Sequence, residues 1–283
     1  MNKTKKIWLS ISACLLGLGV IIFSVAMTSI GWDFTKLSTR RFETNEYKIE
    51  ESFNDISIKT ATADVVFALA TDGQCKVQCY EYEKEKHAVS VQNSTLCINL
   101  VDEKSFLDNI GFNFTSPKIT VYLPNAEYNA LTIRASTSDI QIKKEISFND
   151  IDIAVSTGDV YVKDIKVDAL KISVSTGDIE VIDVCCKTFT STGSTGDTYL
   201  RKVIVEEKMF IERSTGDIEL NGCDAGEIFI ETDTGDVEGT LLSGKVFVVT
   251  TDTGDKRVPN TTSGGRCEIT TDTGDIYITI ENP

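Results

Sequence analysis

The chain has 283 residues, with 43 Asp or Glu against 28 Lys or Arg, and a formal net charge of −15. This acidic balance excludes nucleic acid and anionic lipid as expected partners, because their phosphates would be repelled. His87 is the only histidine, and no phosphate-binding glycine loop or metalloprotease motif occurs, so we expect no enzyme activity and no cofactor.

A short basic leader, residues 1–6, precedes an uncharged segment of 24 residues, 7–30. A helix needs roughly 20 apolar residues to cross the bilayer core, so we predict a transmembrane anchor. Lys3, Lys5 and Lys6 favour a cytoplasmic N-terminus and an extracellular C-terminal domain. Beyond this segment the chain carries 43 acidic and 25 basic residues, a net charge of −18 that keeps a surface domain soluble.

Two processing alternatives remain for this anchor. Residues 24–26 (SVA) have the small side chains of a signal-peptide cleavage site, and residues 11–14 (ISAC) are similar to a lipoprotein box. The apolar run continues past both sites, which favours an uncleaved single-pass anchor over cleavage or lipidation.

After a juxtamembrane linker, 31–42, residues 43–135 contain irregular runs of strand-like alternation. The segment SFNDISI at 52–58 nearly returns as SFNDIDI at 147–153, and Asp64 then falls where Asp159 does. We interpret this front section as irregular rungs in register with the later ones, forming a cap for the exposed sheet edge. His87 lies in the polar run EYEKEKH, where we expect a solvated loop residue.

Residues 136–283 carry the motif STSD, STGD or DTGD eight times, at steps of 20, 19, 19, 20, 19, 19 and 20 residues. A fixed period indicates stacked repeats, and alternation of apolar and polar residues shifts by one at each glycine, as at a bend between two strands. We therefore predict an all-β fold, a β-solenoid (a right- or left-handed β-helix or roll) with rungs about 4.8 Å apart. The predicted turn residues are Asp139, Asp159, Asp178, Asp197, Asp217, Asp236, Asp255, Asp275, Gly158, Gly177, Gly196, Gly216, Gly235, Gly254 and Gly274.

Residues at fixed distances after each turn aspartate are expected to form inward columns. One column comprises Val160, Ile179, Ile218, Val237 and Ile276, and a second comprises Ile165, Val184, Val203, Cys223 and Leu242. Cysteines in such positions, Cys186, Cys223 and Cys267, are interpreted as small core side chains, whereas Cys185 should point outward. Cys75 and Cys79 share one strand face, with Cys97 elsewhere. A disulfide among these three stays open, and the spacing is weak evidence for zinc.

The column of turn aspartates has two interpretations. In the structural one, each carboxylate accepts hydrogen bonds from backbone N–H groups of its own corner. In the alternative, calcium bridges successive rungs through Asp233, Asp236, Asp252, Asp255, Asp272 and Asp275. The glycine-rich nonapeptide spacing of calcium rolls is absent, which favours the structural interpretation. A carbohydrate-active β-helix needs carboxylates grouped beside Lys or Arg on neighbouring strands, and aspartates at corners do not provide that grouping.

Four segments carry a family resemblance: GWDFTKL (31–37), KITVYLPN (118–125), LTIRASTSDIQI (131–142) and the serial STGDI units. They resemble the bacterial putative-adhesin family of β-strand-repeat proteins, a domain of unknown function that includes LiaG-like membrane proteins. The resemblance implies a Gram-positive-type cell surface and a link to envelope-stress signalling, with no catalytic residues to transfer. The DTGD corners and the cysteines depart from the family pattern.

These observations predict a surface scaffold or adhesin-like module that binds an unknown protein or glycan, attached to the membrane by its N-terminal helix. The main alternative is an accessory regulator of envelope-stress signalling that acts through a membrane partner. A calcium-binding roll is a minor alternative.

Overall fold

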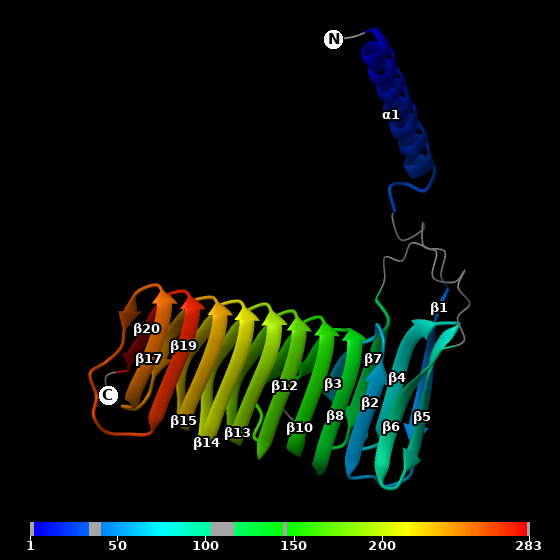
Figure 1. Cartoon of the computed structure of the whole chain (residues 1–283). Coiled ribbons are helices and arrows are strands. Elements are labelled where there is room, and N and C mark those ends of the chain that lie inside the picture. The colour runs from blue at the N-terminus through cyan, green and yellow to red at the C-terminus, as the bar shows by residue number, and fades with distance from the viewer. Residues whose placement is uncertain (1–2, 34–40, 103–115, 144–145, 282–283) are drawn as a thin grey trace. The chain divides into compact units, whose positions relative to one another are not determined.

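The computed structural model describes residues 3–33, 41–102, 116–143 and 146–281, which fall into two units. One unit contains helix α1 (Lys3–Ser29), and the other contains the β-strands (Figure 1). Within α1, residues Lys5–Ser29 are long and apolar enough to cross a membrane, and no residue of their apolar 18-residue window is buried against protein. Such a helix satisfies its own backbone hydrogen bonds, as a bilayer core requires.

The strands of the second unit follow one another along the chain. They are β1 (Phe42–Ile49), β2 (Asp55–Thr60), β3 (Asp64–Leu69), β4 (Cys75–Tyr82), β5 (Glu85–Gln92), β6 (Thr95–Asp102), β7 (Lys118–Leu123), β8 (Glu127–Thr137), β9 (Ile140–Ile142), β10 (Ser147–Thr157), β11 (Val160–Lys163), β12 (Ala169–Thr176), β13 (Ile179–Thr195), β14 (Thr198–Thr215), β15 (Ile218–Thr234), β16 (Val237–Leu241), β17 (Val246–Thr253), β18 (Lys256–Arg257), β19 (Arg266–Thr273) and β20 (Ile276–Ile280).

This unit is a β-solenoid, as the repeat period predicts. Each rung has a strand that runs into a Gly–Asp corner and a strand that leaves it. The strands that run into the corners form one sheet, which we call the leading sheet. The strands that leave the corners form the other, which we call the following sheet. The leading sheet has the order β5-β6-β2-β8-β10-β12-β13-β14-β15-β19-β17, and the following sheet has the order β1-β4-β7-β3-β9-β11-β13-β14-β15-β16-β20-β18. Strands β13, β14 and β15 bend, so each contributes its first half to the following sheet and its second half to the leading sheet.

The rungs stack in parallel and in register, so equivalent side chains form continuous buried columns. Ile179 pairs with Val160 on one side and with Thr198 on the other, and the column continues through Ile218, Val237 and Ile276. These aliphatic residues are at most 1% exposed. Burial of this apolar surface, at about 25 cal/mol per Å², is the main force that holds the rungs together.

The second predicted column needs one correction. A register shift between Asn221 and Cys223 pairs Cys223 with Leu241. Leu241 is therefore fully buried, whereas Leu242 is 42% exposed. The other inward cysteines, Cys186 and Cys267, are buried and Cys185 is exposed, as predicted, and all of the chain's cysteines are free thiols.

The front section contains one regular rung and an antiparallel cap. Strands β2 and β3 pair in parallel with β8 and β9, with Ile56 opposite Leu131, so the predicted register of this segment is confirmed. The neighbouring strands are different, because β1, β4 and β5 form antiparallel pairings (Figure 1). The hairpin of β4 and β5 passes from the following sheet to the leading sheet and so closes this end of the stack.

Rungs at both ends of the stack depart from chain order. At the C-terminal end, β19 and β20 lie between the rung of β15 and β16 and the rung of β17 and β18. At the front, β6 and β7 pair outside β2 and β3, although they follow these strands in the chain. The expected sequential stacking is therefore wrong for the last two turns, because the chain passes over one position and returns to fill it.

Candidate functional site

The predicted turn aspartates form a ladder along the corner edge of the solenoid. In each pair of stacked corners, Oδ1 of one aspartate accepts a hydrogen bond from the backbone N–H of the next. The acceptor–donor pairs are Asp64–Asp139, Asp139–Asp159, Asp159–Asp178, Asp178–Asp197, Asp197–Asp217, Asp217–Asp236, Asp236–Asp275 and Asp275–Asp255, with O···N distances from 2.7 to 3.0 Å. The donor thus belongs to the neighbouring rung, which corrects the expectation of a bond within one corner. The ladder ties neighbouring rungs together through hydrogen bonds to the accepting carboxylates.

The predicted turn glycines meet two steric requirements. Gly177 has a φ of 138°, and a Cβ placed on it would lie 2.2 Å from the carbonyl oxygen of Gly158. Only glycine fits both the backbone conformation and the close approach of the next corner. The remaining turn glycines share the positive φ and the overlap.

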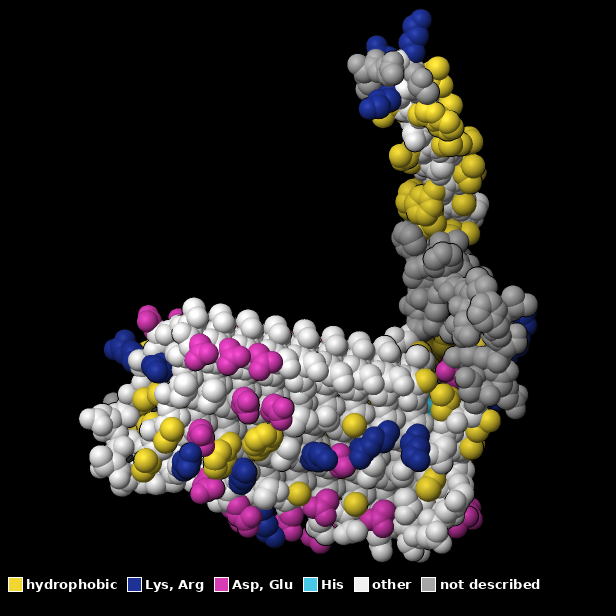
Figure 2. Space-filling view, viewed as in Figure 1, with side chains coloured by type: hydrophobic (Ala, Val, Ile, Leu, Met, Phe, Trp, Pro, Cys, Tyr) yellow, Lys and Arg dark blue, Asp and Glu magenta, His cyan; other side chains and the backbone are white. Residues whose placement is uncertain are grey.

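The six aspartates considered for calcium are distributed over three stacked rungs. Asp233, Asp272 and Asp252 are exposed on β15, β19 and β17, and Figure 2 shows acidic side chains gathered along this end of the corner edge. Among the described residues, the one group of three His, Cys, Asp or Glu ligand atoms within 4.8 Å of one another contains Cys79, Glu81 and His87 and none of these aspartates. Calcium binding therefore stays a prediction, without a preformed ligand cluster to support it.

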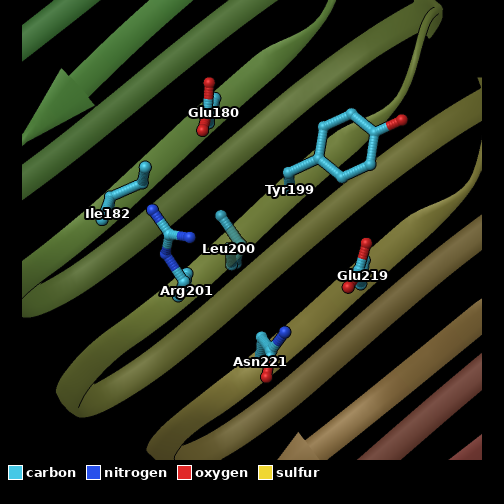
Figure 3. Close-up of a pocket in the computed structure, with 7 residues that line it drawn as sticks. All are labelled: Glu180, Ile182, Tyr199, Leu200, Arg201, Glu219 and Asn221. Atoms are coloured by element: carbon cyan, nitrogen blue, oxygen red, sulfur yellow. The ribbon is translucent and has the colours of Figure 1, made fainter.

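A shallow groove of about 340 Å³ crosses β13, β14 and β15 on the outer face of the following sheet (Figure 3). One row across it is Glu180–Tyr199–Glu219, and the row beside it is Ile182–Arg201–Asn221. A second groove of about 530 Å³ shares Arg201 and Asn221 with the first, so the two hollows adjoin at these residues.

The tyrosine of this groove is held in place by an aspartate of the corner ladder. The Tyr199 hydroxyl donates a hydrogen bond to Oδ2 of Asp197, with an O···O distance of 2.8 Å. This bond raises the pKa of Tyr199 to about 12, with smaller contributions from burial and from the neighbouring aspartates. The ring is 39% exposed, so it offers a fixed apolar face to solvent beside two carboxylates, a guanidinium and an amide.

Sequence reasoning missed this groove, although the pattern held a signal for it. Glu180, Tyr199 and Glu219 each stand two residues after a turn aspartate, on the outward side of the alternation. The sequence reasoning considered only the corner aspartates, and so it did not find Glu180 and Glu219, which line one groove with Arg201 of the neighbouring row.

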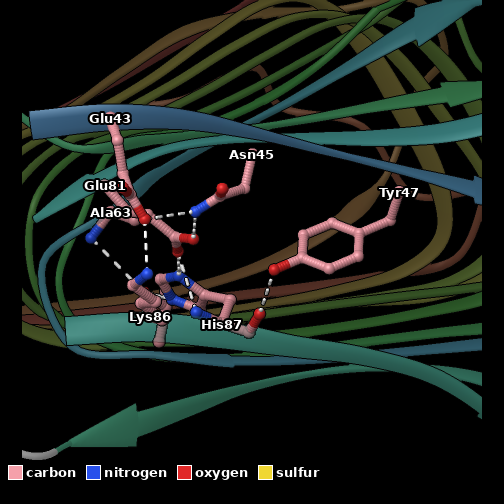
Figure 4. Close-up of polar contacts among 8 residues, drawn as sticks. Glu43, Asn45, Tyr47, Ala63, Glu81, Lys86 and His87 are labelled. Atoms are coloured by element: carbon pink, nitrogen blue, oxygen red, sulfur yellow. Dashed lines mark hydrogen bonds and ion pairs between the residues drawn. The ribbon is translucent and has the colours of Figure 1, made fainter. Parts of the chain in front are cut away.

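A second polar cluster is buried in the cap (Figure 4). Glu81 Oε2 lies 2.7 Å from Nδ1 of His87 and accepts the His87 backbone N–H at 2.8 Å, while its Oε1 accepts an amide N–H of Asn45 at 2.8 Å. His87 Nε2 lies 3.0 Å from the Thr60 hydroxyl. Glu81 and His87 are 1% and 3% exposed, so the expectation of a solvated loop histidine is wrong. His87 is instead an inward residue of β5, just after the turn at 83–84.

The order Thr60–His87–Glu81 has the hydrogen-bond sequence of a catalytic triad. All three residues are buried, and the Thr60 hydroxyl already accepts the Ala63 N–H at 3.3 Å. A nucleophile must meet its substrate, so this arrangement serves the packing of the cap rather than acyl transfer.

Cys79 completes the buried cluster, because its thiol lies on the same inward face of β4 as Glu81. Burial, and then the charge of Glu81, raises the pKa of the Cys79 thiol to about 12. Burial is also the main reason that the pKa of Tyr47, whose hydroxyl donates to the His87 carbonyl at 3.1 Å, is raised.

Comparison with known proteins identifies the architecture. Residues 53–206 and 170–283 match the Toastrack DUF4097 family. No curated protein matches the chain. A putative adhesin from Bacteroides fragilis NCTC 9343 is 18% identical, with a TM-score of 0.51 over 86% of this chain and 98% of that one.

Two further solved structures come from Parabacteroides distasonis ATCC 8503. A putative lipid binding protein is 17% identical, with a TM-score of 0.47 over 87% of this chain and 98% of that one. A putative adhesin is 13% identical, with a TM-score of 0.41 over 84% of this chain and 98% of that one. At such identities, the Bacteroides fragilis structure supports the shared fold and nothing beyond it.

Proposed function

This chain belongs to the Toastrack DUF4097 family, and from that premise we propose that it is a non-enzymatic, membrane-anchored scaffold that binds a protein or glycan at the cell surface. Helix α1 is the anchor, with its N-terminus in the cytoplasm and the solenoid outside. The three lysines at the start of the helix and the net charge of −18 beyond residue 30 support this orientation and a soluble, exposed solenoid.

The groove on the following sheet is the observation that carries the binding role. It combines an exposed aromatic ring with two carboxylates, a guanidinium and an amide. A ring face packs against the C–H face of a sugar or an apolar side chain, while the polar groups orient the ligand's hydroxyls or amides. Because the groove lies on rigid stacked strands, its side chains are already positioned before a ligand arrives.

Binding is tested on intact cells that display the full-length chain, with a fluorescently labelled panel of soluble glycans. We expect at least one glycan to bind, and we expect Tyr199→Ala combined with Arg201→Ala to weaken it by about tenfold or more, a loss typical of a central contact residue. The matched control is Tyr277→Ala, because this tyrosine is 40% exposed on the same sheet but outside the groove.

If the groove variant and the wild type bind the glycan equally well, the groove is not the binding site. Binding that appears only after the cells are permeabilised would contradict the extracellular location. If no glycan binds, the same variants are compared by crosslinking on intact cells. We then expect a protein ligand to crosslink to the wild type and not to the groove variant. A crosslinked partner that depends on α1 but not on the groove would favour the regulatory alternative.

A further inference from the structure

The cap contains three potential metal ligands of different chemical types. The Cys79 thiol, a Glu81 carboxylate oxygen and a His87 ring nitrogen lie within 4.8 Å of one another. They come from the two arms of the β4–β5 hairpin, and they are 0%, 1% and 3% exposed. Buried groups of this kind are normally paired or bound to a metal, because each is costly to desolvate as an ion.

We propose that Cys79, Glu81 and His87 bind one zinc-class divalent cation that fastens the cap hairpin. The site is independent of the groove and of the surface role argued above. Nδ1 of His87 is the ring nitrogen that faces Glu81, so it is the nitrogen that binds the metal.

The charges of the buried groups favour such an ion. Glu81 carries a carboxylate into the core, and Lys86, the residue before His87, already pairs with Glu43 at 2.6 Å on the surface. A divalent cation bound to one carboxylate, one thiolate and one neutral imidazole makes a group of zero net charge. That neutrality lowers the cost of burial, which the Glu81 carboxylate otherwise offsets only through its contacts with His87 and Asn45.

Metal binding must displace protons, and the balance can be written from the contacts. The bond from Cys79 Sγ to the metal replaces the S–H bond, and that proton is released. The proton held between His87 Nδ1 and Glu81 Oε2 is also displaced, either to solvent or to His87 Nε2. No electron transfer takes place, and the metal stays divalent throughout.

The groups around the cluster already form hydrogen bonds with the proposed ligands and so fix their orientation. The Thr60 hydroxyl lies 3.0 Å from His87 Nε2 and can accept its N–H when Nδ1 binds the metal. Asn45 holds the other oxygen of Glu81 at 2.8 Å, and the His87 backbone N–H fixes the carboxylate from β5. Metal-binding histidines almost always donate their second N–H in this manner.

The donor set selects the class of metal. One sulfur, one nitrogen and one oxygen suit zinc, which accepts mixed ligands, whereas calcium and magnesium require oxygen ligands alone. Among the described residues three ligands are grouped here, so a water molecule completes the proposed tetrahedral site.

The test uses the full-length chain in detergent, equilibrated with zinc and then freed of excess metal. We expect one zinc per chain by elemental analysis, with protons released into a weakly buffered solution on binding. With cobalt as the probe, we expect the absorption band of a thiolate–cobalt bond. Absence of that band, or of retained zinc, in the folded wild type would overturn the site.

Variants separate this site from the chain's other cysteines. Cys79→Ser and His87→Gln should lose the bound metal, while Cys185→Ser, at an exposed thiol outside the cluster, should retain it. Thr60→Val should weaken binding by about tenfold, as expected for loss of a group that orients a ligand. Retention of the cobalt band by Cys79→Ser would contradict the proposal. If that variant does not fold, the cobalt spectrum of the wild type decides the matter.

Discussion

Gly177 illustrates at the residue scale how tightly the corners are constrained. The residue has a φ of 138°, and a Cβ added to it would lie only 2.2 Å from the Gly158 carbonyl oxygen. We expect Gly177→Ala to lower the free energy of unfolding by roughly 1–3 kcal/mol from backbone strain alone, with more from the overlap. Urea denaturation followed by circular dichroism measures the loss.

Gly73 provides the control for this prediction. It also has a positive φ, 73°, but nothing lies within 4 Å of the position that a Cβ would take. Gly73→Ala should therefore cost only the strain of the left-handed conformation, about 1–2 kcal/mol. Equal losses for the two variants would show that contact between stacked corners adds nothing.

The glycines and aspartates of the corners could be located from the sequence, because each recurs at a fixed step. Buried polar residues could not be located in this way. Arg213 is 1% exposed, and its guanidinium occupies the space left by the missing side chain of Gly193. It donates to the Thr198 hydroxyl and to the Val174 carbonyl, at 2.9 and 3.3 Å. This pairing depends on register across three rungs, which period alone does not reveal.

The thiols of individual strands make the stability of the fold sensitive to alkaline pH. Burial raises the pKa of Cys79 in β4, Cys186 in β13 and Cys267 in β19 from 9.0 to about 12. Between these values the unfolded chain loses the thiol protons while the folded chain keeps them. The stabilisation is therefore complete below pH 9 and is lost as the pH rises toward 12.

We expect the urea midpoint to fall steadily over this alkaline range. In Cys186→Ala combined with Cys267→Ala, the midpoint should be lower below pH 9, because two core side chains are truncated, but it should decline less steeply above pH 9. Cys185→Ala should leave the slope unchanged, since this thiol is exposed. An identical slope in the double variant would refute the role of the buried thiols.

At the scale of elements, alternation indicated strands but not their direction. Strands β4 and β5 alternate as the rungs do, yet they pair in an antiparallel manner and form the cap. The hairpin brings His87 inward beside Glu81, whereas the composition of EYEKEKH indicated solvent exposure. Both the direction of these strands and the burial of His87 depend on pairing partners that are far apart in the sequence. A local pattern contains no information about those partners.

At the scale of the whole solenoid, the order of the last rungs makes an unusual truncation experiment possible. Removing 262–283 deletes β19 and β20, which lie between two other rungs. The strands β17 and β18 then lose their neighbours. Removing 243–283 deletes both outer rungs and leaves a continuous stack that ends at β15 and β16.

We therefore expect the longer deletion to be the less damaging one. The chain lacking 243–283 should resist limited proteolysis and melt in one transition, while the chain lacking 262–283 should be cleaved within 243–261. Stacked repeats gain most of their stability from contacts between neighbours, which the shorter deletion removes from β17. Greater resistance of the shorter deletion would contradict the observed rung order.

The out-of-order rungs also determine how this architecture can change in length. A unit of 19 or 20 residues duplicated directly after β20 could not stack on β20, because β16 and β18 already flank that strand. The same duplication between two interior corners would simply lengthen the stack by one step. Duplication among the interior rungs therefore keeps the pairing of the remaining strands, whereas duplication at the out-of-order rungs disturbs it.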